Sequence, residues 1–210
     1  MAEPAPATEN NEARRVQMLR AAAELVCERG FSETRISDVA KRAGVSSALV
    51  IYYFGTRDRL LVDALRYSEE SGYEAAERML AEIPSLRERL SLLIRWTCVP
   101  EAEDEIPGAW GLWFDLWAQA FRHDEVKAGR VELDARWRRM IADAVESADL
   151  DTEVDAKMFA LEFSALLDGL SIQVALEDPE VDSTVAYDIA MRFAERELNL
   201  PAEAKSARKR

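Results

Sequence analysis

The chain has 210 residues, of which 49% are apolar and 32% are charged, and its formal net charge is −13. This length allows one small and one medium unit, each with its own core, and the absence of any run of 18 apolar residues predicts no membrane partner. The leading MAEPAPATEN lacks the apolar stretch of a secretion signal, and Cys27 and Cys98 fit helical apolar patterns, so we expect a disulfide-free cytoplasmic protein.

Residues 1–10 read as a disordered lead, and the first helix is expected over residues 11–29. Its apolar side chains recur at the i, i+3, i+4 spacing of one helix face, and Gly30 supplies the stop. Two short helices joined at Gly44 follow within residues 34–54. This order predicts a helix-turn-helix, whose second helix enters a DNA groove.

The turn chemistry of this segment supports the interpretation. Thr34 is the expected N-cap of the first short helix and Ser46 that of the second, while Gly44 suits the positive φ of a tight turn. Val50 and Phe54 are four residues apart and predict the buried face of the second helix. A helical hairpin within a larger bundle is the alternative that the pattern alone leaves open.

Helical patterns fill most of the remaining chain without β-type alternation, so the predicted fold class is all-α. Prolines mark several breaks, and residues 100–108 form a predicted loop. Thr152 and either Asp182 or Ser183 are expected N-caps. The predicted helices are 56–81, 85–98, 109–122, 124–148, 152–177 and 182–198, and a basic tail follows at 201–210.

Charge is divided unevenly along the chain. Residues 11–60 hold nine Arg and Lys against six Asp and Glu, a net +3, whereas residues 61–210 hold 18 basic against 32 acidic residues, a net −14. A mildly basic head on an acidic body suits a protein that meets DNA phosphates with one end. Uneven surface charge without a function is the alternative.

Aromatic residues concentrate in the acidic body. Five of them share one stripe of one predicted helix, and two further tryptophans lie on neighbouring helices. Such a cluster forms either a heavy aromatic core or the lining of a cavity between helices. These ligand-binding candidates are Trp110, Trp113, Phe114, Trp117 and Phe121 on the stripe, with Trp96 and Trp137 beside it.

One carboxylate, Glu162, falls between Phe159 and Phe163 on a predicted apolar helix face. A carboxylate in such a place must be solvated, paired or facing a ligand. Together with the aromatic rings it suits an organic cation, so Glu162 and Phe163 join the ligand-binding candidates. A salt bridge to Arg95 or Arg136, and a neutral apolar ligand, are the alternatives.

Three segments within residues 12–60 resemble the DNA-binding domain of the TetR/AcrR family of transcriptional regulators. They are Glu28-Arg29-Gly30-Phe31, the run Asp38-Val39-Ala40…Ala43-Gly44-Val45-Ser46, and Tyr53-Phe54 followed by Thr56-Arg57-Asp58-Arg59-Leu60-Leu61. The resemblance implies an all-helical homodimer with about nine helices per chain. It also implies a DNA-binding domain at 11–55 and a ligand-sensing and dimerisation domain at 56–200.

By position, the resemblance assigns the residues that face DNA. Ile51, Tyr53 and Arg57 would border phosphates, and the start of the second short helix would read bases in the major groove. Ile51 stands where the family commonly has tyrosine and Leu49 where a small hydroxyl residue is common, so we expect apolar contact with thymine methyl groups. The DNA-binding candidates are Arg35, Ser37, Ser46, Ser47, Ala48, Leu49, Ile51, Tyr52, Tyr53 and Arg57.

The segment ALLDGLSIQ, residues 165–173, resembles the body of the choline-responsive (BetI-like) subgroup of the family. This implies a small-molecule effector such as an organic cation. In the family the last two helices form the dimer interface, and Gly169, which costs a helix about 1 kcal/mol against alanine, would be justified by a close helix approach. The dimer candidates are Gly169, Ile172, Ile189 and Phe193.

Enzyme signatures are absent from the sequence. It has a single histidine, His123, and no metal-ligand spacing, glycine-rich phosphate loop or nucleophile elbow, so we predict no catalytic residue, metal or cofactor. The expected function is a ligand-responsive DNA-binding regulator, with repression as the family's commoner mode. The alternative is a helical adaptor or small-molecule-binding protein without DNA binding.

Overall fold

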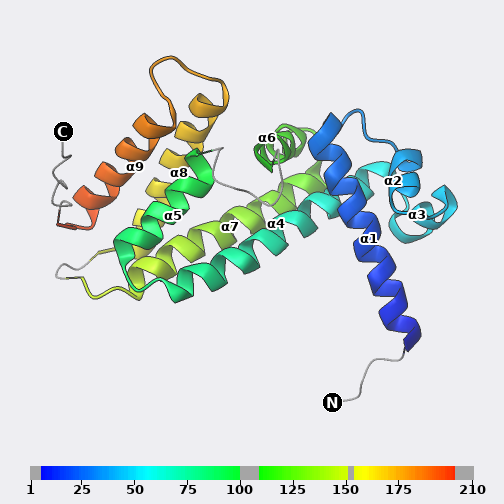
Figure 1. Cartoon of the computed structure of the whole chain (residues 1–210), viewed down its shortest axis with the longest axis horizontal. Helices are drawn as coiled ribbons and strands as arrows, with labels where there is room; N and C mark the ends of the chain where they lie inside the picture. The colour runs from blue at the N-terminus through cyan, green and yellow to red at the C-terminus, as the bar shows by residue number, and fades with distance from the viewer. Residues whose placement is uncertain (1–5, 100–108, 151–153, 202–210) are drawn as a thin grey trace, which may run out of the picture. The chain divides into compact units, whose positions relative to one another are not determined.

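The computed structural model describes residues 6–99, 109–150 and 154–201, and this part of the chain folds into nine α-helices without a β-strand (Figure 1). The predicted all-α fold class is confirmed. The helices are α1 (Pro6–Arg29), α2 (Ile36–Arg42), α3 (Ser47–Phe54), α4 (Arg57–Glu82), α5 (Leu86–Cys98), α6 (Ala109–Ala120), α7 (Asp124–Glu146), α8 (Ala156–Ala175) and α9 (Ser183–Glu197).

The helices begin and end close to the predicted residues, with two corrections outside the helix-turn-helix. Residues 6–10, predicted as part of a disordered lead, form the first turns of α1. α8 begins at Ala156 rather than at residue 152, because the Asp155 carboxylate caps it by accepting two backbone N–H groups at 3.0 and 3.1 Å. Thr152, the predicted loop at 100–108 and most of the basic tail lie outside the described residues.

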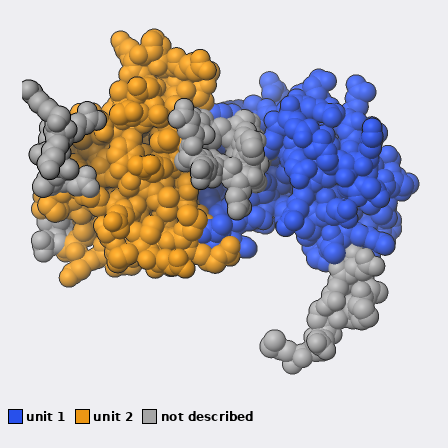
Figure 2. All heavy atoms as spheres, viewed as in Figure 1, with its two compact units in different colours: residues 1–75, 104–134 blue, residues 76–103, 135–210 orange. Residues whose placement is uncertain are grey.

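The chain divides into two compact units (Figure 2). Unit 1 comprises residues 1–75 and 104–134, and unit 2 comprises residues 76–103 and 135–210. The division falls within α4 and α7, so each of these helices contributes residues to both units. α6 therefore groups with the helix-turn-helix, whereas the sequence division assigned residues 109–122 to the body.

Unit 1 has one apolar core that extends beyond the helix-turn-helix. α1 packs against α2 and α6, and α2 packs against α3. Val50 and Phe54 of α3 are buried, as predicted, and Leu116 of α6 and Val126 of α7 belong to the same cluster. The core of the three-helix DNA-binding domain is therefore completed by side chains from later helices.

Unit 2 is built on mutual packing of α5, α8 and α9. Phe159, Phe163 and Phe193 form a stacked aromatic centre with ring centroids 5.2–6.1 Å apart. Among the described helices, α8 alone is long and apolar enough to cross a membrane by length and composition. Apolar side chains of α8 form part of the core of this bundle, because Phe163 and Leu167 are fully buried in it.

Candidate functional site

α3 has the local structure of a recognition helix. Ser46 caps its start, with the hydroxyl oxygen accepting the Leu49 backbone N–H at 3.2 Å, and Gly44 makes the preceding turn with φ of +64°. Val50 and Phe54 anchor the helix and are at most 3% exposed. The turn, the cap and the buried face predicted from the sequence are all confirmed.

The opposite side of α3 faces solvent. Tyr52 is 82% exposed and Ile51 49%, and the exposed set also includes Ser46, Ser47 and Ala48 at the start of the helix. Large apolar and phenolic side chains that project from a helix suit contact with thymine methyl groups and base edges. Their contact with particular bases stays a prediction.

Tyr53 is oriented by α1. It is half-buried, and its hydroxyl donates to Asn11 Oδ1 at 3.0 Å. This bond fixes the ring at the edge of α3, beside the exposed Tyr52, whose ring contacts it at a centroid distance of 5.6 Å. The phosphate contact predicted for Tyr53 stays a prediction.

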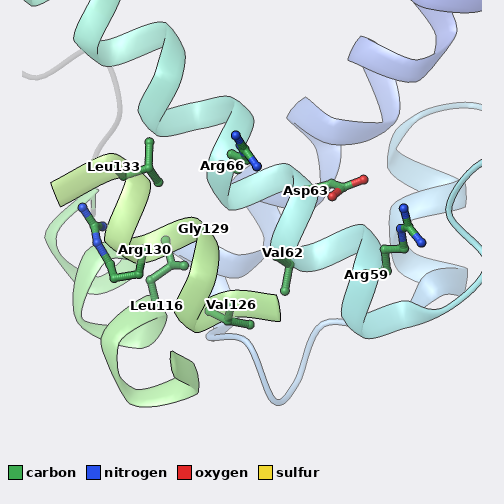
Figure 3. A pocket seen from close by; sticks show the side chains of 9 residues that line it. All are labelled: Arg59, Val62, Asp63, Arg66, Leu116, Val126, Gly129, Arg130 and Leu133. Carbon is green, nitrogen blue, oxygen red and sulfur yellow. The ribbon is translucent and has the colours of Figure 1, made fainter. Parts of the chain in front are cut away.

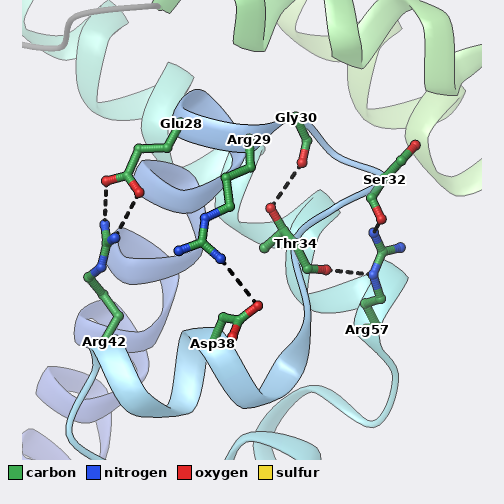
Figure 4. Close-up of polar contacts among 8 residues, drawn as sticks. All are labelled: Glu28, Arg29, Gly30, Ser32, Thr34, Asp38, Arg42 and Arg57. Atoms are coloured by element: carbon green, nitrogen blue, oxygen red, sulfur yellow. Dashed lines mark hydrogen bonds and ion pairs between the residues drawn. The ribbon is translucent and has the colours of Figure 1, made fainter.

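Arg57 is held by contacts within the protein. Its Nε donates to the Thr34 carbonyl at 2.7 Å and its Nη2 to the Ser32 carbonyl at 3.1 Å (Figure 4). Its Nη2 also donates to the Phe31 carbonyl, and its Nη1 pairs with Asp58 at 2.7 Å. Every nitrogen of the guanidinium therefore has an acceptor inside the protein. In this arrangement Arg57 fixes the loop that leads into α2, and the phosphate contact predicted for it stays a prediction.

Thr34 is a correction in the same loop. Predicted as the N-cap of α2, it is buried and donates its hydroxyl to the Gly30 carbonyl at 3.0 Å (Figure 4). Arg35 occupies the N-cap position of α2 and makes no capping bond with its side chain. No sequence pattern marks this arrangement, in which Gly30 has a positive φ and the Thr34 hydroxyl donates to the Gly30 carbonyl instead of accepting an N–H group of α2.

The basic residues of the head separate into paired and unpaired groups. Arg42 makes a bidentate pair with Glu28 at 2.7 and 2.8 Å, which lowers the pKa of Glu28, and Arg29 pairs with Asp38 at 3.4 Å (Figure 4). Exposed Arg35 and Lys41 have no ion-pair partner among the described residues. They are the better candidates for phosphate contact, and Lys41 was missing from the predicted set because pairing is invisible in a charge count.

The aromatic stripe on α6 forms a ring cluster. Trp113, Phe114 and Trp117 are half-buried, with centroids 4.9 Å apart for the two tryptophans and 5.7 and 6.4 Å apart for each tryptophan with Phe114. We call these three residues the α6 aromatic cluster. Phe121 departs from the predicted stripe, since it is 90% exposed beyond the end of α6, and the side chain of Trp110 lies outside the described residues.

The other aromatic candidates belong to unit 2. Trp137 is buried, and Trp96 is half-buried. Phe163 is fully buried in the stack with Phe159 and Phe193, so it fills the core rather than lining an open site. Phe193, predicted for the dimer interface, also contributes to this intrachain stack.

Glu162 is a further correction. The sequence placed it on an apolar face with Phe159 and Phe163, but those two rings are buried and Glu162 is exposed. One residue along a helix turns the side chain by about 100°, which is enough to move Glu162 off the buried face. Arg136, one of its suggested partners, pairs instead with Glu77 at 2.9 and 3.0 Å.

An exposed apolar face runs along α8 to the start of α9. Gly169 lies on it, and a Cβ built there would meet no atom within 4 Å, so the expected close helix approach is not made within the described chain. The predicted interface residue Ile172 is exposed on this face, and Ile189 is half-buried. The large exposed side chains are Met158, Leu161, Ile172, Leu176 and Val185.

Unit 1 contains a cavity of about 190 Å³ that the sequence did not reveal (Figure 3). Its aliphatic walls include Leu116 of α6, but none of the predicted ligand residues lines it. The lining residues are Arg59, Val62, Asp63, Arg66, Leu116, Val126, Gly129, Arg130 and Leu133.

Arg130 connects this cavity to a buried ion pair. It is 4% exposed and binds both oxygens of Glu69 at 2.7 and 2.9 Å, as well as Asp134 at 2.8 Å. Burial raises the pKa of Glu69 to about 7, against the lowering effect of Arg130. Among the described residues, no group of three His, Cys, Asp or Glu is placed to hold a metal ion.

Two family models match the chain. Residues 18–64 match the bacterial regulatory proteins of the tetR family, and residues 86–199 match the C-terminal domain of BetI-type transcriptional repressors. The first match covers the helix-turn-helix, and the second covers α5 to α9. Together they include the recognition helix, the α6 aromatic cluster and the exposed face of α8.

Individual relatives agree with the family models. The chain is 26% identical over 192 residues to the regulator BetI of Rhizobium meliloti, covering 91% of this chain and 93% of that protein. It is 28% identical over 188 residues to the regulator PksA of Bacillus subtilis, covering 89% and 90%. A transcriptional regulator from Saccharomonospora viridis, solved in complex with choline, superposes with a TM-score of 0.75 at 27% identity, covering 90% of this chain and 98% of that one. The chain thus belongs to the TetR family of bacterial transcriptional regulators, with a helix-turn-helix DNA-binding domain and a BetI-type C-terminal domain.

Proposed function

We propose that this protein is a homodimeric cytoplasmic repressor that leaves its operator when an organic cation of the choline class binds the α6 aromatic cluster. Family membership already makes it a ligand-responsive DNA-binding regulator. The observation that carries the effector class is the cluster itself, in which Trp113, Phe114 and Trp117 remain partly exposed.

The aromatic rings alone can attract a cation, so the proposed site requires no carboxylate as a counter-charge. A quaternary ammonium group binds the π-faces of aromatic rings, each worth about 0.5–2 kcal/mol according to its desolvation. Glu162 is no counter-charge in this proposal, because it is exposed on α8 in unit 2. The choline complex of the Saccharomonospora viridis regulator supports the same ligand class.

The dimer is proposed on the exposed face of α8 and α9. Its large apolar side chains include Leu176, which is 75% exposed, and Met158 and Leu161, which are each about half-exposed. Large apolar side chains that remain exposed in a group mark an interaction surface. A two-fold dimer would set its recognition helices about 34–36 Å apart, as successive major grooves require.

The experiment that tests the proposal measures release from DNA. A fluorescently labelled DNA duplex is taken from the region upstream of the gene that encodes this chain, and its anisotropy reports protein binding. Choline is added in one titration, and 3,3-dimethylbutan-1-ol, a neutral isostere of choline, is added in another. We expect choline to release the DNA and the neutral alcohol to be at least tenfold weaker, because only the cation interacts with the ring quadrupoles. Equal potency of the two compounds would exclude a cation effector.

Two variants locate the binding site in the same assay. Trp117→Ala removes a ring of the α6 aromatic cluster and is expected to raise the choline concentration needed for half-release at least fivefold. Phe121→Ala is the matched control, because Phe121 is a 90% exposed ring just beyond the same helix. If both variants responded like the wild type, the α6 aromatic cluster would not be the effector site.

A further inference from the structure

The backbone N–H of Phe31 is held by a side chain from α6. α1 ends at Arg29, and Gly30 turns the chain with φ of +81°. In the common helix C-terminal motif, the N–H two residues past the helix end returns to a carbonyl of the same helix. Here that N–H donates to Asp115 Oδ2 at 3.0 Å, across 84 residues of sequence.

Helix stability does not explain a carboxylate at this position. The C-terminus of a helix carries partial negative charge, which disfavours a nearby anion. The last turn of α1 already holds Glu28, and its one cation, Arg29, is paired with Asp38. The carboxylate also packs against Gly30, since a Cβ built there would lie in ordinary van der Waals contact with Oδ2 at 3.5 Å.

Phe31 is a junction between three helices. Its N–H binds Asp115 of α6, its carbonyl accepts from Arg57 of α4, and the Arg57 guanidinium lies 5.2 Å from the centre of its ring. The ring itself is 3% exposed in the core shared with Leu116. The chain continues from Phe31 through Thr34, also bonded to Arg57, directly into α2. A shift at Phe31 is therefore passed to the helix-turn-helix.

α6 carries the two functions on nearly opposite sides. Asp115 is two residues from Trp113 and two from Trp117, and two residues turn a helix by about 200°. One side therefore bears the tryptophans of the α6 aromatic cluster and the other reaches Phe31. A ligand that displaces α6 at the rings must move the Asp115 carboxylate relative to Phe31.

We propose that Asp115 is a positioning residue through which α6 holds the helix-turn-helix in its DNA-competent arrangement, and that effector binding withdraws its carboxylate from the Phe31 N–H. The first part stands on the contacts in unit 1 alone. The second part rests on the proposed effector site at the α6 aromatic cluster.

The first test compares three variants for operator affinity without ligand. Asp115→Ala removes the acceptor and is expected to weaken operator binding at least fivefold. Asp115→Asn keeps an acceptor oxygen of the same reach and is expected to bind within twofold of the wild type. Gln119→Ala is the matched control, because Gln119 is a half-buried side chain one turn along α6 with no side-chain hydrogen bond among the described residues; it should leave affinity within twofold.

The second test adds choline and follows the Phe31 amide by hydrogen exchange. In the wild type, saturating choline should speed exchange at Phe31 and weaken operator binding at least tenfold. In Asp115→Ala the exchange should be fast already, and choline should change operator affinity less than twofold while still quenching tryptophan fluorescence.

Separate results would overturn the two proposals. Wild-type operator affinity in Asp115→Ala, or an Asp115→Asn variant as weak as Asp115→Ala, would refute the hydrogen-bond role of Asp115. A wild-type protein that ignores choline would refute the effector assignment alone, because the ligand-free comparison of the three variants still decides the role of Asp115.

Discussion

The basic side chains around α2 divide into those that hold the head together and those left for DNA. Arg57 and Arg42 have their guanidinium groups committed to loop carbonyls and to Glu28. Arg35 and Lys41 are exposed and have no ion-pair partner in the described chain. A side chain that is already engaged must break its contacts to bind a phosphate. Arg35 and Lys41 are therefore favoured for phosphate contact.

Arg35→Ala is predicted to weaken binding to all DNA sequences by a similar factor. Loss of one phosphate contact should reduce the slope of log K against log salt concentration by about 1. Binding titrations from 50 to 200 mM salt measure this slope. Arg42→Ala serves as the control with an unchanged slope, and a reversed outcome for the two variants would show that the ion pairs open on DNA.

Arg57→Ala is predicted to act on stability. Removing the guanidinium leaves the carbonyls of Phe31, Ser32 and Thr34 without their donor. A hydrogen bond to a charged group contributes about 1.5–3 kcal/mol net, and water replaces part of this at the exposed acceptors. We expect a loss of about 2 kcal/mol in urea unfolding, with the salt slope of DNA binding unchanged. An unchanged urea midpoint together with a flatter salt slope would show instead that Arg57 contacts a phosphate.

Single-residue chemistry was predictable where the partner is local in sequence. The Ser46 and Asp182 caps and the Gly44 turn depend on neighbours within three residues, and all three are as predicted. The roles of Thr34, Arg57 and Asp115 depend on carbonyls or N–H groups presented by a folded loop. No sequence pattern marks those groups, so these roles required the structure.

At the level of elements, periodicity located every described helix but not every helix face. α8 shows why: its apolar residues occupy both a buried face, with Phe159 and Phe163, and an exposed face, with Met158 and Leu161. When a helix is apolar on two sides, its buried face cannot be identified from the sequence alone. Glu162 was assigned to the wrong face for this reason.

The pairing of α4 with α7 in unit 1 should depend on pH through Glu69. Because burial raises the pKa of Glu69 to about 7, the folded protein binds a proton that the unfolded chain, with a pKa near its ordinary 4.5, has already lost. This contribution to stability is complete below pH 4.5 and is lost as the pH rises through 7. Glu69→Gln mimics the protonated side chain at every pH.

Urea unfolding of both proteins from pH 5 to 8 checks this prediction. The stability of Glu69→Gln relative to the wild type should increase as the pH rises through 7. If the wild type instead gained on the variant with rising pH, the ion pair with Arg130 would dominate over burial and the pKa of Glu69 would be lowered.

The exposed face of α8 and α9 predicts how the chain associates. Leu161→Glu places a charge on this face and should convert the dimer to a monomer in light scattering, with the helical circular dichroism retained. Val131→Glu is the control, because Val131 is a similarly exposed apolar residue on the part of α7 that belongs to unit 1. Dissociation by both variants, or by neither, would place the dimer interface elsewhere.

For the molecule as a whole, the sequence predicted the composition of the parts better than their grouping. The basic head, the acidic aromatic body and the helical fold were visible in charge and periodicity. The inclusion of α6 in unit 1 was not, because it depends on Leu116 entering the core of the helix-turn-helix. That contact gives α6, the helix of the proposed effector site, a direct place in unit 1.

A repressor of this kind requires its two ligands to oppose each other. If choline weakens operator binding by a given factor, operator DNA must weaken choline binding by the same factor, since the coupling free energy is reciprocal. A tenfold factor corresponds to about 1.4 kcal/mol per site. Uniform binding of choline to both states would shift nothing, however tight it is.

The most direct test is the dissociation constant of choline, followed by tryptophan fluorescence, with and without saturating operator DNA. A scrambled duplex of equal length, measured at the same salt concentration, serves as the control. We predict that choline binds at least tenfold more weakly when the operator is bound, and that the scrambled duplex has no effect. Equal choline affinity in the free and operator-bound protein would contradict the account, even if both ligands bind tightly.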